Sequence, residues 1–151
     1  MPTLSQQSEF KLATCNEKIR KVIERVSSKR NTIVTCGFRD QAEQDKLFAE
    51  GKTQKQWPEG NHNTSPSDAV DIVPVVAGKV PWPEFPDGLP TEIRAAVRKY
   101  AKQTAIFAFL AGYIQAVSDD EGYKCRWGGD WDSDGDTCDN SFDDLVHFEI
   151  T

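Results

Sequence analysis

The order of helical and extended patterns along the chain is the feature that most limits its fold. Stretches with helical spacing of apolar residues alternate with shorter stretches typical of strands. The predicted helices cover residues 12–26, 40–51 and 91–117, and the predicted strands cover residues 32–36, 68–73, 123–127 and 145–150. Helices set apart from a small, largely antiparallel sheet make an α+β domain. We predict this class, with helices flanking the sheet and an N-terminal helical segment over about residues 1–30.

The second predicted helix has a clear start and a clear end. Asp40 is predicted to cap its N-terminus, with Glu43 at the capping-box position, and Gly51 is expected to end it. Leu47 and Phe48 are predicted to form its buried face.

The chain contains only two histidines, His62 and His147. Imidazole is the commonest zinc ligand, and a catalytic zinc takes three protein ligands and leaves one position for water. Taken singly, a histidine in a strand is more often a hydrogen-bonded structural or surface residue. Two histidines and one well-placed aspartate would nevertheless complete a catalytic zinc site, and few other residues of the chain could do so.

Strand alternation gives the second histidine a definite direction. In the last predicted strand, Val146, Phe148 and Ile150 share one face, while Leu145, His147 and Glu149 lie on the other. The apolar face should pack into the core. We therefore expect His147 and Glu149 to face a cleft, where Glu149 either orients the His147 ring or is simply a solvated acid.

Asp71 is an acid between apolar neighbours in the strand predicted at 68–73. A buried carboxylate without a partner is costly, so Asp71 should have a positively charged one. An arginine would serve, and so would a cation held together with the two histidines. The three residues together favour a metal site.

Composition excludes several classes of function. The chain has 151 residues, the length of one domain, and a net charge of -6, which argues against a nucleic-acid binder and against electrostatic docking to an anionic surface. No apolar run approaches the ~18 residues of a membrane span, so we expect no membrane insertion. The N-terminal residues lack the apolar core of a signal peptide, and we expect synthesis and storage in the cytoplasm.

The four cysteines do not form a zinc knuckle, because none of them is part of a C-x-x-C pair. Cys125 and Cys138 bracket one loop and could form a disulfide. Free thiols in a protein made in the cytosol are the alternative.

Four blocks of the sequence resemble the M15 zinc peptidases, the family of peptidoglycan-cleaving D-alanyl-D-alanine carboxypeptidases and L-alanyl-D-glutamate endopeptidases. The blocks occur in the family's order and are GFRDQAEQDKLFAEG from residue 37, HNTSPSDAVDIVP from residue 62, RWGGDWD from residue 126 and DLVHFE from residue 144. The second block resembles the form found in phage endolysins. Two departures are Val146, where the family usually has proline, and a longer spacing between His62 and Asp71, which matches the phage subgroup.

The resemblance implies a role for each matching residue. His62, Asp71 and His147 would bind zinc, Asp144 would be the catalytic acid/base, and Arg39 would contact the substrate near the scissile carbonyl. Asp144 and His147 are three residues apart, so an ideal strand would place them on opposite faces. We therefore predict that Asp144 lies in a bend just before the strand.

The resemblance also implies a fold and a function. The fold would be that of Hedgehog domains and D-Ala-D-Ala peptidases, in a single domain over residues 1–151 without a separate wall-binding domain. The function would be zinc-dependent hydrolysis of the peptidoglycan stem, most simply at L-Ala-D-Glu, by a monomeric phage endolysin that leaves the host cytoplasm to reach the cell wall. The alternatives are a D-Ala-D-Ala carboxypeptidase and a non-catalytic, zinc-stabilised wall-binding module.

An acidic loop follows the third block. Asp130, Asp132 and Asp134 form the D-x-D-x-D-G opening of a calcium loop, but Ser141 stands where such loops usually carry a bidentate glutamate. Either Ca²⁺ binds here or the loop is a solvated acidic turn. The neighbouring Trp127 and Trp131 could line the substrate groove or belong to the core.

Overall fold

A four-stranded antiparallel sheet positions the site in this computed structural model, which describes residues 3–82, 93–137 and 140–151. Within these residues the strands are β1 (Thr32–Cys36), β2 (Val70–Pro74), β3 (Cys125–Gly128) and β4 (Asp144–Ile150). They are arranged in the order β1-β2-β4-β3, and each neighbouring pair is antiparallel. The predicted class, a small antiparallel sheet with flanking helices, is confirmed.

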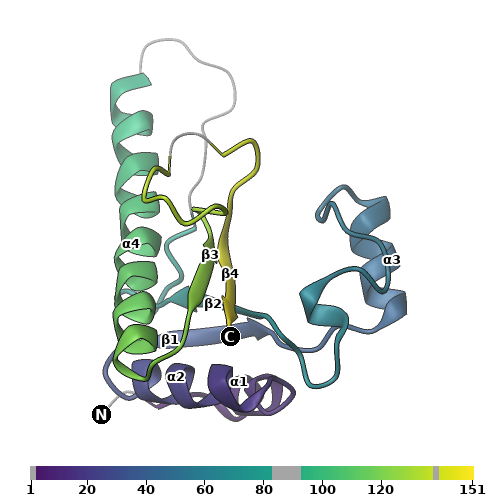
Figure 1. Ribbon diagram of the computed structural model, residues 1–151. Coiled ribbons are helices and arrows are strands. Elements are labelled where there is room, and N and C mark those ends of the chain that lie inside the picture. Colours follow the sequence, from purple (N-terminus) through teal and green to yellow (C-terminus); the bar gives the residue numbers. More distant parts are fainter. Residues whose placement is uncertain (1–2, 83–92, 138–139) are drawn as a thin grey trace.

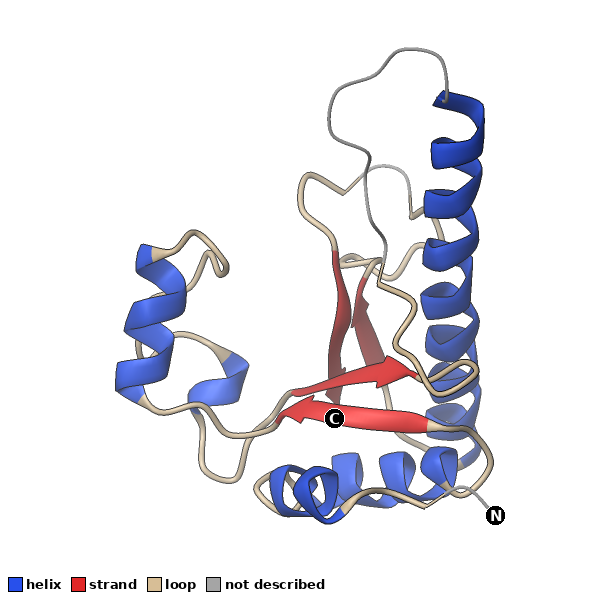
Figure 2. Cartoon of the chain, turned by 180° about the vertical axis from the view of Figure 1, so that it is seen from behind, coloured by secondary structure: helices blue, strands red, loops and turns tan. Residues whose placement is uncertain are grey.

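The helices divide into a packed group and a separate one. They are α1 (Gln6–Leu12), α2 (Glu17–Ser27), α3 (Gln41–Ala49), the short 3-10 helix η1 (Asn61–Asn63) and α4 (Ile93–Asp120). α1 contacts β1, and α2 and α4 contact each other and the sheet. Figure 2 shows that α3 stands to one side of the sheet, away from α1, α2 and α4 (see also Figure 1). Among the described helices, none combines the length and the apolar character needed to cross a membrane.

The core lies where α2 and α4 meet the sheet. The fully buried apolar residues there include Ile19, Val22 and Ile23 of α2, Ile72 of β2, Ile114 of α4, and Phe148 and Ile150 of β4. Burial of such side chains stabilises a fold by about 1.5–3 kcal/mol each. This core holds β2 and β4 side by side, and both strands carry residues of the candidate site.

The single helix predicted over residues 12–26 is wrong, because α1 ends at Leu12 and α2 begins at Glu17. The Asn16 side chain caps α2 by accepting a hydrogen bond from the Ile19 N–H at 2.9 Å. The turn between the helices also forms two backbone hydrogen bonds of 2.9 Å with Ser67. Capping and this tertiary contact outweigh the continuous apolar pattern.

The predicted cap of α3 is confirmed, whereas its predicted buried face is wrong. The Asp40 side chain accepts a hydrogen bond from the Glu43 N–H at 2.9 Å, and the helix ends before Gly51. Phe48 is 38% exposed. The structure describes every residue of α3, and the buried one is Gln44, at 1% exposure. The contacts of Gln44 are polar, with Arg39, Lys55 and Asn63.

Candidate active site

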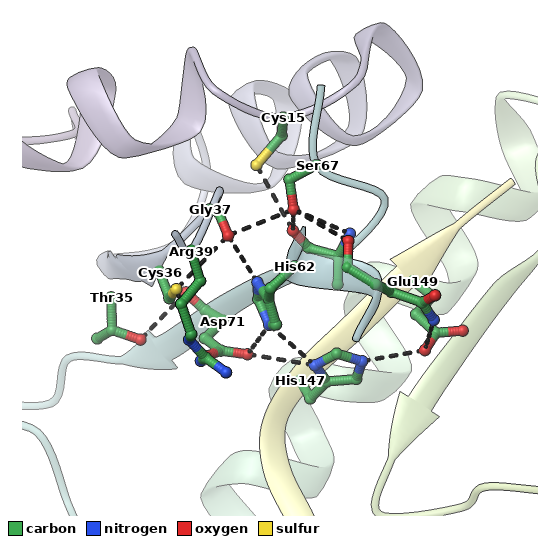
Figure 3. A network of polar contacts seen from close by, with 12 residues as sticks. Cys15, Thr35, Cys36, Gly37, Arg39, His62, Ser67, Asp71, His147 and Glu149 are labelled. Atoms are coloured by element: carbon green, nitrogen blue, oxygen red, sulfur yellow. Dashed lines mark hydrogen bonds and ion pairs between the residues drawn. The ribbon is translucent and has the colours of Figure 1, made fainter. Parts of the chain in front are cut away.

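The side chains of His62, Asp71 and His147 point toward one another and meet at one place (Figure 3). His62 Nε2 lies 2.9 Å from Asp71 Oδ1 and 3.1 Å from His147 Nδ1. Asp71 Oδ1 lies 3.3 Å from His147 Nδ1. All three residues are buried, with exposures of 4–8%. The structure therefore brings together the three residues that the sequence suggested as metal ligands.

Three structural elements, β2, β4 and η1, bring the three residues together. Asp71 of β2 and His147 of β4 are cross-strand partners, so the register of the sheet makes them neighbours. His62 lies in η1, where the chain returns from α3 toward β2. The Arg39 N–H donates a 2.8 Å hydrogen bond to the His62 carbonyl, which holds this loop against the end of β1.

The outer nitrogen of each imidazole has an acceptor. His62 Nδ1 donates to the Gly37 carbonyl at 2.6 Å, and His147 Nε2 donates to Glu149 Oε1 at 3.1 Å (Figure 3). These contacts set the tautomers, so that His62 Nε2 and His147 Nδ1 direct their lone pairs to the shared point. An outer acceptor behind each histidine is the usual arrangement around a metal ion. Glu149 thus makes the contact that an orienting residue would make.

The cluster of His62, Asp71 and His147 brings a buried carboxylate oxygen and two imidazole nitrogens together, so a positive charge between them is favourable. Burial disfavours the charged form of His62, but the Asp71 carboxylate outweighs burial and raises the pKa of His62 to about 10. Burial likewise opposes ionisation of Asp71, but the two imidazoles lower the pKa of its carboxyl well below the usual range. A proton on the imidazoles, or a cation bound between them, would supply this charge.

The same donor atoms fit a zinc ion. A tetrahedral ion with bonds of about 2.0–2.1 Å holds neighbouring ligand atoms about 3.3 Å apart. The observed separations are 2.9, 3.1 and 3.3 Å. Cys36 is a further donor near this cluster, because one ligand atom each of Cys36, His62 and Asp71 lie within 4.8 Å of one another. The sequence analysis missed Cys36, since it considered only paired cysteines.

Asp144 reaches the same cleft through an irregularity in β4. Asp144, Val146, His147 and Glu149 line the cleft, whereas Leu145 packs against the core. The alternation therefore changes face between Val146 and His147, where the β3–β4 register also shifts. The Trp127 indole N–H holds this stretch by donating to the Leu145 carbonyl at 2.9 Å.

Two sequence predictions about this strand are therefore wrong. Asp144 does not precede the strand but is the first residue of β4. Val146 lines the cleft and Leu145 packs against the core, which is the reverse of the predicted faces. Both errors have one cause, because the register shift lets residues three apart face the same side. Burial, together with the negative charge of Asp71, raises the pKa of the Asp144 carboxyl.

Arg39 contacts Asp71 on the side away from the histidines. Its Nη2 donates to Asp71 Oδ2 at 3.4 Å and to the Cys36 sulfur at 3.6 Å, and its Nη1 donates to Gln44 Oε1 at 3.2 Å. Asp71 therefore has both kinds of partner that the sequence suggested, an arginine and the histidine cluster. Arg39 also lines the cleft.

The cleft is a groove of about 840 Å³ between the sheet and the α3 side of the molecule. The sheet contributes Asp71, Asp144 and His147, and the α3 side contributes Gln44 and residues 52–55. Trp131 lines the groove with its ring centroid 5.4 Å from that of His147, whereas Trp127 is part of the core. His62, Asp71 and His147 are all among the residues that line this groove.

The sequence model of a protein family, the phage L-alanyl-D-glutamate peptidases, matches residues 2–151 of this chain. The chain belongs to this family. The prediction of a peptidase that acts on peptidoglycan is therefore confirmed at the level of the family.

A solved structure shares the fold of this phage peptidase. It is the L-Ala D-Glu endopeptidase ChiX of Serratia marcescens, with a TM-score of 0.68 and 21% identity, over 99% of this chain and 91% of that one. A comparison with curated protein sequences gave no significant match.

The acidic loop of the peptidase gathers its first three aspartates. Ligand atoms of Asp130, Asp132 and Asp134 lie within 4.8 Å of one another. Asp130 is 7% exposed, and its Oδ2 accepts a 3.1 Å hydrogen bond from the Gly135 N–H. Its buried Oδ1 has no hydrogen-bond partner among the residues that the structure describes. A buried carboxylate oxygen without a partner is costly. This oxygen is therefore the atom of the loop that most needs a partner.

The structure describes three of the four cysteines, Cys15, Cys36 and Cys125. Cys138 lies outside the described residues, and with it the Cys125–Cys138 pairing. Cys15 and Cys36 are free thiols. Burial raises the pKa of the Cys15 thiol to about 12, so this residue stays protonated and acts as a core side chain.

Proposed function

We propose that this peptidase is a zinc-dependent endolysin that hydrolyses the L-Ala-D-Glu amide bond of the peptidoglycan stem. The observation that carries the zinc proposal is the convergence of His62 Nε2, Asp71 Oδ1 and His147 Nδ1 within 3.3 Å, with an acceptor behind each imidazole. The bond is proposed from the family's name and from the name of the structural neighbour.

The three residues would hold zinc and leave a position facing the groove. Zinc supplies a Lewis acid that lowers the pKa of a water molecule to about 7 and polarises a carbonyl. Glu149 and the Gly37 carbonyl keep both imidazoles in the tautomers that this binding needs. The Glu149 carboxylate suits this role, since Arg126 and Asn61 also hold it in place.

Asp144 would carry the proton in the reaction. Its carboxylate takes a proton from the attacking water and delivers it to the amine that leaves when the amide breaks. A carboxyl with a raised pKa is suited to both steps. Arg39 holds the outer oxygen of Asp71 and lies beside the groove, where its charge would also polarise the scissile carbonyl.

Digestion of purified peptidoglycan tests the cleaved bond. We expect the zinc-loaded protein to release fragments with a new L-Ala carboxyl terminus and a new D-Glu amino terminus, identified by mass spectrometry. Removal of the metal with a chelator should stop the release, and added zinc should restore it. Loss of only the terminal D-Ala would instead indicate a D-Ala-D-Ala carboxypeptidase. Binding to walls without any new termini would indicate a non-catalytic module.

We further propose that the acidic loop binds Ca²⁺ through Asp130, Asp132 and Asp134. The unpartnered, buried Asp130 Oδ1 supports this proposal over a solvated acidic turn. Trp131 follows Asp130 directly and lies against His147, so an ion here would order one wall of the groove.

Calcium titration of the zinc-loaded protein tests this loop. We expect one site by calorimetry and a rise in the melting temperature with Ca²⁺. Asp132→Asn should weaken Ca²⁺ binding by roughly ten-fold or more, because a charged oxygen ligand is lost. Asp45→Asn, an equal change of charge on exposed α3, should leave binding unchanged. A wild-type protein that gives neither heat nor a shift in melting temperature would make the loop a solvated turn.

The remaining parts of the proposal concern the setting of the enzyme. We propose that it acts as a monomer. We also propose that it is stored in the host cytoplasm and reaches the wall only after release.

A further inference from the structure

The groove is lined by one cation that has no acidic partner. The described basic residues that line it are Arg39, Lys52, Lys55 and Arg126. Arg39 contacts Asp71, the Arg126 guanidinium binds Glu149 at 2.6 Å, and Lys52 binds Glu50 at 2.7 Å. Within the described part of the chain, the Lys55 ammonium has no ion pair. Its charge is therefore available to a ligand in the groove.

The backbone of Lys55 is held in place by a buried side chain. Gln44 Nε2 donates to the Lys55 carbonyl at 2.6 Å, and Gln44 is 1% exposed. Gln44 Oε1 accepts hydrogen bonds of 3.2 Å from Arg39 Nη1 and from Asn63 Nδ2. One buried amide thus ties Lys55 to the arginine that contacts Asp71. Lys55 is anchored relative to the metal-binding cluster, although its side chain is exposed.

The two sides of the groove differ in charge. The sheet side carries Asp71, Asp144 and Glu149 with one cation, Arg126, whereas the α3 side carries Lys52 and Lys55 with one acid, Glu59. The whole chain has a net charge of -6, which repels an anionic peptide, so a free cation inside the groove gives local attraction and a preferred orientation.

The substrate of the proposed function carries a matching anion. A glutamate whose amine is acylated by alanine still has two carboxyl groups. Continuation of the stem uses one of them, which leaves one carboxylate free on the amine side of the cleaved bond. Arg39 is less suited to bind it, because both terminal nitrogens of its guanidinium already donate to protein atoms.

We propose that Lys55 is a specificity-determining residue that binds the free carboxylate of the substrate's glutamate. This inference rests on the proposed function. It deepens that function by making an acidic stem, rather than its carboxamide form, the preferred substrate. Gln44 acts as the positioning residue that places the Lys55 backbone.

A pair of synthetic stem peptides tests the inference. One peptide has the free glutamate carboxylate, and the other has the corresponding carboxamide. For wild-type enzyme we expect a lower KM with the acid. In Lys55→Gln, the KM for the acid should rise about three- to five-fold, the size expected for a partly exposed ion pair, while kcat stays the same. The KM for the carboxamide should not change, and Lys55→Glu should favour the carboxamide.

The control is Lys46→Gln, which makes the same change of charge on α3 but does not line the groove. It should behave as wild type with both peptides. If Lys55→Gln leaves the ratio of the two KM values unchanged while wild type cleaves both peptides, the inference on Lys55 is wrong and the proposed function stands. If wild type cleaves neither peptide at the L-Ala-D-Glu bond, the proposed function itself is wrong, and the inference that rests on it fails too.

Discussion

His147→Ala is expected to abolish both metal binding and peptidase activity. The substitution removes Nδ1, one of three donor atoms that lie within 3.3 Å of one another. It also leaves Asp71 Oδ1 with one imidazole partner in place of two. Loss of an outer partner of a metal ligand commonly costs 10–100-fold, so loss of the ligand itself should lower activity by more than about 100-fold.

The metal content of the purified variant, measured by mass spectrometry, decides this prediction together with the rate of peptidoglycan digestion. Glu149→Gln is the matched control, because it leaves all three donor atoms in place and weakens the contact behind the His147 ring, together with the ion pair to Arg126. It should still bind zinc, with an affinity lowered by about 10–100-fold. Circular dichroism should show that both variants are folded. A His147→Ala protein that retains one tightly bound zinc would remove His147 from the ligand set.

Asp144→Asn is expected to keep the fold and the metal but to lose turnover. The amide has nearly the shape of the carboxyl, so the packing of this half-buried side chain should survive. It cannot accept the proton of the attacking water, and general acid–base catalysis contributes about 10²–10⁴-fold to rates. We therefore expect kcat to fall by a factor in that range, with little change in zinc content.

Asp143→Asn provides a close control for this experiment. Asp143 is the neighbouring acid, but its side chain is exposed and it does not line the groove. Its kcat on the stem peptide should equal that of wild type. Near-normal kcat in Asp144→Asn would mean that another group carries the proton.

Local patterns in the sequence predicted most of the elements. The β-branched stretch at residues 32–36 is β1, and the Asp40 cap of α3 forms as expected. Such features depend on contacts within a few residues, which one sequence contains in full. The break between α1 and α2 depends on the local Asn16 cap but also on Ser67, which is distant along the chain, so the local pattern alone did not predict it.

The candidate site shows the same division. The two histidines and Asp71 could be found because few residues of the right chemistry exist in the chain, and the motif resemblance indicated Asp144 and Arg39. Their metal and catalytic roles remain predictions. Cys36, Gln44 and Lys55 were not assigned site roles, since nothing in their local spacing shows that they lie beside the same groove.

The sequence by itself determined the chemistry available to this protein, namely which donors, acids and cations exist and which segments favour strands or helices. Only the tertiary structure decided which of these groups share one space. The antiparallel register of β2 and β4 places Asp71 opposite His147, and the register shift at the start of β4 turns Asp144 to the same side. The buried Gln44 then joins the α3 side to this centre. Pairing and register follow from packing of the whole core, and therefore no local pattern contains them.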